Sequence, residues 1–158
     1  MKKNQGFSLV ELIVVVAIMA ILIGVLAPAY LRYVEKSRKS TDVSAIDEMI
    51  GAADKVAVDP ELEVPSGAKF TISINGGTAS ISYATSAATA ASVVTDEWKA
   101  LANMKTADYT IKSSAWSTGD GSFVGTVGDD GDVTWGHGGT VANDMCSFSS
   151  ALAKKAGS

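Results

Sequence analysis

The feature that most constrains this chain is a stretch of 20 residues, Leu12–Leu31, that contains no charged side chain. Eighteen of these residues are apolar, against 56 of the other 138. As a helix rising ~1.5 Å per residue, the stretch is ~30 Å long, which matches the hydrocarbon core of a bilayer. It is the only stretch of this kind, so multi-span transporters and channels are excluded.

The composition of the whole chain excludes further classes. A length of 158 residues fits one globular domain. A single cysteine, Cys146, excludes a disulfide scaffold. Thirteen basic against 17 acidic residues give a net charge of −4, and no basic cluster lies among aromatic residues, which argues against nucleic-acid binding. The apolar content argues against a disordered chain.

Three interpretations of the apolar stretch are open: a cleaved secretory signal, a plain membrane anchor, or a membrane helix with a further role. Lys2 and Lys3, with the small residues around Pro28, fit a signal peptide. Glu11 favours the third interpretation, because an ionised carboxylate in hydrocarbon costs ~2.5–3.5 kcal/mol at a helix centre. We therefore expect a positively charged partner for Glu11, and an α-amine would serve if the chain began nearby.

The basic residues that flank the stretch do not settle its orientation. Lys2 and Lys3 precede it, while a larger group follows it, diluted by Glu35 and Asp42. A positive-inside count weakly favours an external N-terminus. The group that follows consists of Arg32, Lys36, Arg38 and Lys39.

The run Gly6-Phe7-Ser8-Leu9-Val10-Glu11 at the start of this stretch resembles the precursors of type IV pilins and their pseudopilin relatives. That family has a short basic leader ending in Gly, then Phe, Thr or Ser, two apolar residues and Glu. The resemblance covers Met1 to Ser40. It implies an α+β fold, with one long N-terminal helix packed on an antiparallel sheet.

The resemblance also implies how the chain is processed. A prepilin peptidase would cut between Gly6 and Phe7, remove residues 1–6 and methylate the new amine of Phe7. Residues 7–31 would span the membrane and later form the fibre core, and residues 32–158 would form the globular domain. Glu11 would pair with the N-terminal amine of a neighbouring subunit, which sets axial register because each charge alone is penalised in an apolar setting.

Gly24 and Pro28 are expected to form the weak point of the helix. Pro28 lacks an N–H and its ring crowds the Gly24 carbonyl, and glycine itself is a poor helix former. The resemblance implies a bend or local melting there in the fibre. A simple kink is the alternative, since Pro and Gly are common in membrane helices.

Periodicity predicts the remaining elements. The helix is expected to run from Phe7 to Val58 and to end near Asp59-Pro60. Asp42 and the charged residues after it are expected to lie off an amphipathic stripe, which comprises Val43, Ile46, Ile50, Ala53 and Ala57. Alternation predicts hairpins over 70–83 and 123–135 and a strand over 109–112. A loop or weak helix is expected over 85–92, followed by a short helix capped by Thr95 with Trp98 and Leu101 inward. A short helix or closing loop is expected over 141–156.

No catalytic, zinc or phosphate-binding arrangement is predicted, and the chain is expected not to be an enzyme. His137 stands in a glycine-rich segment, 136–139, expected to be a flexible turn, and Cys146 is expected to be a small buried residue near Phe148. No cofactor is expected. Calcium at a Gly-rich acidic region is the low-ranked alternative, because its spacing does not match an EF-hand loop. The acidic residues concerned are Asp120, Asp129, Asp130 and Asp132.

The resemblance therefore implies a structural subunit, a type IV pilin. It would be a single-pass precursor in the cytoplasmic membrane and then part of an extracellular homo-oligomeric helical fibre serving adhesion, motility or DNA uptake. The expected partners are a prepilin peptidase, a membrane assembly platform protein and minor pilins. The alternative in the same superfamily is a minor pilin, or a pseudopilin of a type II secretion or DNA-uptake machine. A hypothesis of another class is a secreted or anchored binding domain with residues 1–29 as its signal.

Overall fold

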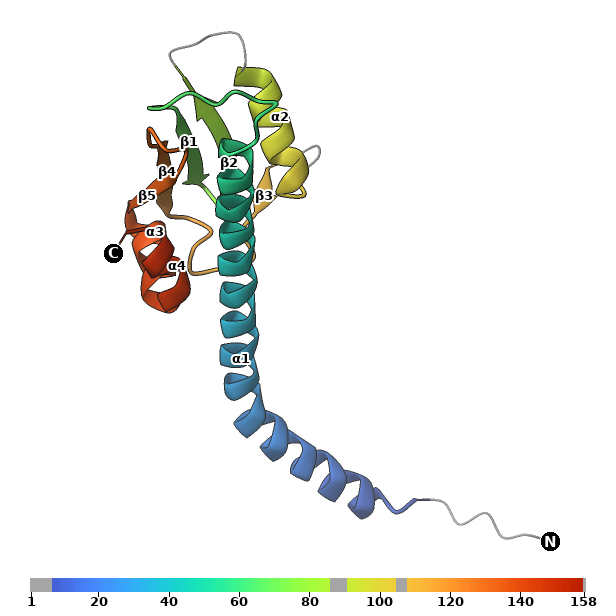
Figure 1. Cartoon of the computed structure of the whole chain (residues 1–158). Coiled ribbons are helices and arrows are strands. Elements are labelled where there is room, and N and C mark those ends of the chain that lie inside the picture. The colour runs from blue at the N-terminus through green and yellow to red at the C-terminus, as the bar shows by residue number, and fades with distance from the viewer. Residues whose placement is uncertain (1–6, 86–90, 105–107, 158) are drawn as a thin grey trace, which may run out of the picture. The chain divides into compact units, whose positions relative to one another are not determined.

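The apolar stretch lies within one long helix, α1, Leu9–Ala57, in a computed structural model that describes residues 7–85, 91–104 and 108–157 (Figure 1). The helix ends just before Asp59-Pro60, as predicted, because the residue before a proline is driven out of the helical region. The chain divides into two compact units, Met1–Ser37 and Arg38–Ser158, and α1 contributes to both.

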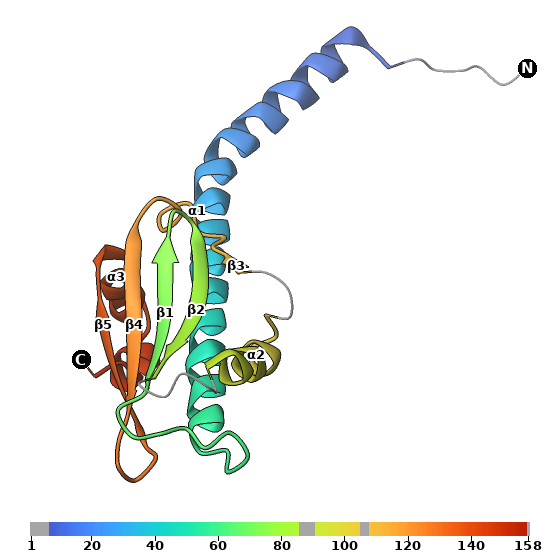
Figure 2. The ribbon, with the colours of Figure 1, turned by 90° about the horizontal axis from the view of Figure 1, so that it is seen from above.

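The second unit is built on a five-stranded sheet in the order β3-β2-β1-β4-β5, in which every neighbouring pair is antiparallel (Figure 2). Together with α1 this confirms the predicted α+β fold. The strands are β1 Lys69–Asn75, β2 Thr78–Ala84, β3 Tyr109–Thr110, β4 Asp120–Val127 and β5 Val133–Gly138. The shorter helices are α2 Ala91–Leu101, α3 Thr140–Phe148 and α4 Ser150–Lys155.

Turn chemistry fixes the first hairpin. Gly76 and Gly77, between β1 and β2, have φ angles of 55° and 82°. A two-residue hairpin loop of type I′ needs positive φ at both central positions, and glycine adopts it without steric cost. Ile72 consequently pairs with Ile81, and the apolar residues of both strands share one face. Both predicted hairpins are confirmed, the second one as β4 and β5 with longer strands than expected.

The core lies between that face of the sheet and the second half of α1. Phe70 and Phe123 are fully buried, and Trp98 of α2 donates from Nε1 to the Met49 carbonyl of α1 at 2.8 Å. The opposite face of β1 and β2 carries Ser and Thr side chains. All five residues of the predicted stripe on α1 are buried: Val43, Ile46, Ile50, Ala53 and Ala57.

The prediction for α2 was wrong in two respects. The helix begins at Ala91, so Thr95 is inside it, and its hydroxyl donates to the Ala91 carbonyl at 2.7 Å instead of capping the N-terminus. Trp98 is buried as predicted, but Leu101 is exposed because the helix ends there and the chain turns inward at Ala102. The loop or weak helix predicted over 85–92 falls mainly on residues 86–90, outside the described part of the chain.

Three further expectations need correction. Asp42 was placed off the apolar stripe of α1, but its side chain is fully buried. The segment 136–138 continues β5 instead of forming a flexible turn, because all three of its residues pair with β4. The strand predicted over 109–112 is only the two residues of β3.

The segment 141–156, expected to be a short helix or closing loop, is largely two short helices, α3 and α4.

Candidate functional site: the N-terminal helix segment and its carboxylates

The first turn of α1 is closed by a carboxylate. The backbone N–H of Ser8 donates to Oε2 of Glu11 at 2.9 Å, and the N–H of Leu12 donates to the Ser8 carbonyl at 3.2 Å. Since α1 begins at Leu9, Ser8 is the N-cap residue and Glu11 occupies the third helical position, where a Glu side chain completes one half of a capping box. Sequence reasoning missed this role, although a Ser three residues before a Glu is its ordinary sequence signature.

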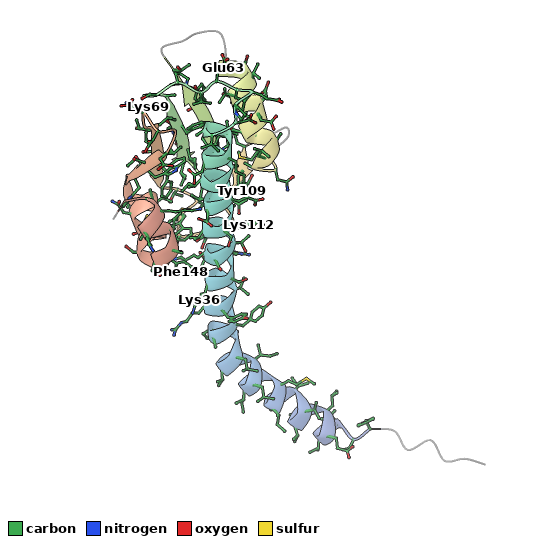
Figure 3. All side chains as sticks on the ribbon, in the orientation of Figure 1. Lys36, Glu63, Lys69, Tyr109, Lys112 and Phe148 are labelled. Atoms are coloured by element: carbon green, nitrogen blue, oxygen red, sulfur yellow. The ribbon has the colours of Figure 1, made fainter. Side chains whose placement is uncertain are left out.

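The segment that follows Glu11 exposes its apolar side chains in the single chain. Every residue from 7 to 33 is exposed, and the exposed fractions of the large apolar residues between Leu9 and Leu31 run from 45% at Val15 to 72% at Leu9. Figure 3 shows the side chains projecting from the ribbon of this segment. Within the described residues, α1 is the one helix long and apolar enough to span a membrane. A continuous apolar surface of this size requires lipid or protein to cover it.

The other predicted site residues lie along the same segment. Gly6 is outside the described residues, and Phe7 precedes the helix with 90% of its surface exposed. Gly24 and Pro28 are both helical, and nothing lies within 4 Å of a Cβ added at Gly24. The blue part of α1, which includes both residues, is visibly bent in Figure 1.

A second carboxylate on α1, Asp42, holds the segment around β3. Oδ1 accepts from the Tyr109 hydroxyl at 2.8 Å and the Lys112 N–H at 2.9 Å, and Oδ2 accepts from the Ser113 N–H at 2.7 Å. Tyr109 and Lys112 are labelled beside α1 in Figure 3. Burial, reinforced by the hydrogen bond and negative charge of Asp42, raises the pKa of Tyr109 above its ordinary value. Asp42 therefore acts within the folded domain.

The fold separates Asp120 from the other three acidic residues of the predicted calcium alternative. Asp120 begins β4, whereas the other three lie in or beside the turn at its far end, ~23 Å away at ~3.3 Å per residue. Asp129 accepts from the Ser66 hydroxyl, and Oδ1 of Asp130 faces the Asp132 N–H at 3.4 Å. No group of three or more potential metal ligands occurs among the described residues.

His137 and Cys146 both lie close to the C-terminal helices. Nδ1 of His137 is 3.1 Å from the Ala156 carbonyl oxygen. Cys146, the one cysteine of the sequence, is buried in α3, as predicted. The imidazole therefore contacts the end of α4, and the thiol belongs to the apolar core.

Known proteins are similar to this chain both in its N-terminal segment and over most of its length. Residues 1–27 match the family described as the prokaryotic N-terminal methylation motif. Fimbrial protein Q of Moraxella bovis is 31% identical over 129 residues, which cover 82% of this chain and 72% of that protein. The chain belongs to the type IV pilin family. The type IV major alpha-pilin of Moraxella bovis is also similar to this pilin, with 45% identity over 62 residues, 39% of this chain and 36% of that protein. No solved structure matches the pilin significantly.

Membership of the type IV pilin family explains why the candidate site is an exposed surface of α1 and not a cleft. Pilins are structural subunits, and the features they share are an N-terminal methylation motif and an apolar helix. In this pilin the two features meet at Glu11, which lies within the matched residues and at the start of the exposed apolar surface.

Proposed function

We propose that this pilin is made as a membrane precursor, is cleaved between Gly6 and Phe7 by a prepilin peptidase, is methylated on the Phe7 amine and polymerises into an extracellular pilus. The observation that carries the proposal is the uncovered apolar surface of residues 9–31. Lipid covers this surface in a single-pass precursor of the cytoplasmic membrane, and sister helices cover it in the fibre. The two Moraxella bovis relatives are named as a fimbrial protein and a pilin, which supports a fibre-forming role.

The transfer from lipid to fibre replaces one apolar environment with another. Lipid tails are as apolar as leucine side chains, so helix association in that setting depends on packing and on polar contacts. Hydrophobic burial alone therefore does not select an axial position. Glu11 is the one charged residue between Phe7 and Leu31, and we assign the axial register to it.

Glu11 has the hydrogen-bonding capacity for this role. An ionised carboxylate offers about four lone-pair positions, and the described residues use one of them for the Ser8 N–H. Cleavage after Gly6 would create an α-amine, and methylation leaves that amine basic. A neighbouring subunit whose Phe7 amine meets Glu11 satisfies both charges, whereas a shifted subunit leaves both unpaired in an apolar setting.

Mass spectrometry of the mature N-terminus tests the processing step. A mature chain beginning at methylated Phe7 is expected, and Gly6→Val is expected to block its formation. A chain beginning at Tyr30 would instead indicate an ordinary secretory signal. A mature product of normal size from Gly6→Val would contradict the assigned cleavage site.

Two variants separate the charge of Glu11 from its capping bond. Glu11→Gln keeps an amide oxygen for the Ser8 N–H but removes the charge, because Gln serves equally at this position of a capping box. Glu11→Leu removes both. We expect both variants to be cleaved and both to fail to form pili that can be sheared from the cell surface. Normal pili from Glu11→Gln alone would show that the cap, and not the charge, is what assembly needs.

The amount of this pilin in the same sheared fraction tests whether it is a major or a minor subunit of the pilus. A major pilin dominates this fraction, whereas a minor pilin or a secretion or DNA-uptake pseudopilin does not. Delivery to the fibre would further involve a membrane assembly platform and minor pilins. The role of the pilus in adhesion, motility or DNA uptake is then read from strains that lack the gene. The proposed structural function requires no catalytic residue.

A further inference from the structure

The charges of this pilin are segregated along its sequence. Residues 32–39, directly after the apolar run, contain four basic residues and one acidic residue, while residues 40–158 contain seven basic and 15 acidic ones. This basic segment opposes the positive-inside rule if the domain lies outside the cell, as the proposed function requires. Pairing through Glu11 makes no use of it, so the basic segment needs its own explanation.

Two of its basic residues, Arg32 and Lys36, lie in the first unit and share a helix face. Residues four apart in an α-helix are surface neighbours, and both side chains are exposed. The Lys36 side chain extends away from the ribbon in Figure 3. Tyr30 and Tyr33, on the same two turns, are 66% and 73% exposed. Exposed tyrosines beside lysine and arginine at the end of an apolar helix are typical of a membrane–water interface.

The rise of the helix places these cations at one particular depth. The apolar run accounts for the ~30 Å hydrocarbon core, and the headgroup regions add ~5–7 Å on each side. Arg32 is the first residue past the run, and Lys36 lies ~6 Å farther along the helix at ~1.5 Å per residue. Counted from Leu31, the Cα of Arg32 lies ~1.5 Å and that of Lys36 ~7.5 Å beyond the run, at the inner and outer edges of the headgroup layer, so both long side chains reach the phosphates. Lys39 is instead engaged within the domain, with Nζ 5.2 Å from the centre of the Trp116 ring.

We propose that Arg32 and Lys36 bind the phosphate groups of anionic phospholipids in the outer leaflet while the pilin waits in the membrane. This inference rests on the proposed membrane precursor and adds a partner to it. The guanidinium and ammonium groups match a phosphate oxygen in charge and hydrogen bonding. The contact fixes the depth of the helix before assembly. The contact also opposes premature extraction of the pilin, because the helix must break its contact with the phosphates to leave the bilayer.

The acidic domain of a second copy is the other anionic surface available. Headgroup phosphates fit better because Arg32 and Lys36 fall within the headgroup layer and stand next to exposed interfacial tyrosines. Basic side chains near an anionic membrane surface contribute about 1 kcal/mol each, which is about a fivefold preference per residue. A protein partner would not depend on the charge of the surrounding lipid, so the two occupants can be distinguished.

Lipid selectivity of the full-length pilin tests the inference. The chain is reconstituted into phosphatidylcholine vesicles containing spin-labelled phosphatidylglycerol or spin-labelled phosphatidylcholine, and electron spin resonance gives the motionally restricted fraction of each. We expect a preference for phosphatidylglycerol that concentrated NaCl screens. In the Arg32→Gln/Lys36→Gln variant this preference is expected to fall by about fivefold or more. The matched control Lys69→Gln/Lys154→Gln removes the same charge from exposed positions of the domain and is expected to keep it.

The outcomes separate this inference from the proposed function. A pilin that inserts but shows equal selectivity before and after Arg32→Gln/Lys36→Gln overturns the inference alone. If the variant instead loses self-association in vesicles without anionic lipid, a second copy is the occupant and the lipid contact is refuted. A chain that is washed from vesicles at alkaline pH does not span the bilayer, which refutes the membrane precursor and the inference together.

Discussion

Removing the buried carboxylate of Asp42 is expected to unfold the domain at markedly lower temperature. Asp42→Ala leaves three hydrogen-bond donors without their acceptor: the Tyr109 hydroxyl and the N–H groups of Lys112 and Ser113. Asp42→Asn keeps one oxygen but turns an N–H₂ group toward at least one of these donors. Both changes act on a side chain with no exposed surface.

The magnitude follows from the burial of each donor. A buried donor left unsatisfied costs about 1–3 kcal/mol. The Ser113 N–H is buried and the Tyr109 hydroxyl is partly buried, so we expect Asp42→Ala to lower the free energy of unfolding by about 3–5 kcal/mol. Asp42→Asn is expected to cost about half as much, because one acceptor remains. For a domain of this size, Asp42→Ala then lowers Tm by about 10–20 °C.

The assay is thermal unfolding of the full-length pilin in detergent, followed by near-ultraviolet circular dichroism. All three tryptophans, Trp98, Trp116 and Trp135, are buried in the second unit and report on its packing. Asp47→Asn is the matched control, because Asp47 pairs with Lys155 at 3.0 Å where both side chains are substantially exposed, and such surface pairs contribute at most about 1 kcal/mol. A Tm for Asp42→Ala equal to that of Asp47→Asn would refute the reasoning.

Two further predictions concern the same domain. Burial and Asp42 raise the pKa of Tyr109, so the folded state retains a proton that the unfolded chain loses above about pH 10, and stability falls as pH rises past that point. In urea unfolding from pH 8 to 11, Tyr109→Phe is expected to make this fall in stability shallower. An unchanged dependence of stability on pH would contradict the assignment to Tyr109. Gly77→Ala is expected to cost about 1–3 kcal/mol, because it combines a φ of 82° with a carbonyl oxygen 2.8 Å from the new Cβ, whereas Gly76→Asn has open space and a residue that tolerates positive φ. Equal Tm values for these two variants would show that the close approach is relieved without cost.

The elements that could be predicted from sequence are those specified by local rules. Gly76 and Gly77 fix a hairpin through their own backbone, and alternation in the flanking strands assigns the faces of the sheet. The stripe on α1 follows from helical periodicity alone. Each of these rules involves residues within one or two elements, so a single sequence contains enough information to apply them.

The features that were missed depend on contacts between distant segments. Asp42 is predicted to lie off the apolar stripe of α1, and charged side chains are seldom fully buried. Its donors lie 67 to 71 residues away in sequence, so no local pattern could reveal them. Thr95 was assigned as a cap because threonine favours that position, but the burial of Val94 and Trp98 on one face extends α2 back past it. Tertiary packing overrode a local preference in both cases.

Glu11 and Asp42 of α1 therefore differ in where their partners come from. The chain itself supplies three donors to Asp42, and they hold it in the core; losing Asp42 should damage folding first and assembly only as a consequence. Among the described residues, Glu11 receives one backbone donor at the edge of a surface that the single chain leaves uncovered. Losing its charge should leave the Tm of the domain unchanged and abolish pili. If Glu11→Gln lowered the Tm of the domain as Asp42→Asn does, the distinction between a folding carboxylate and an assembly carboxylate would fail.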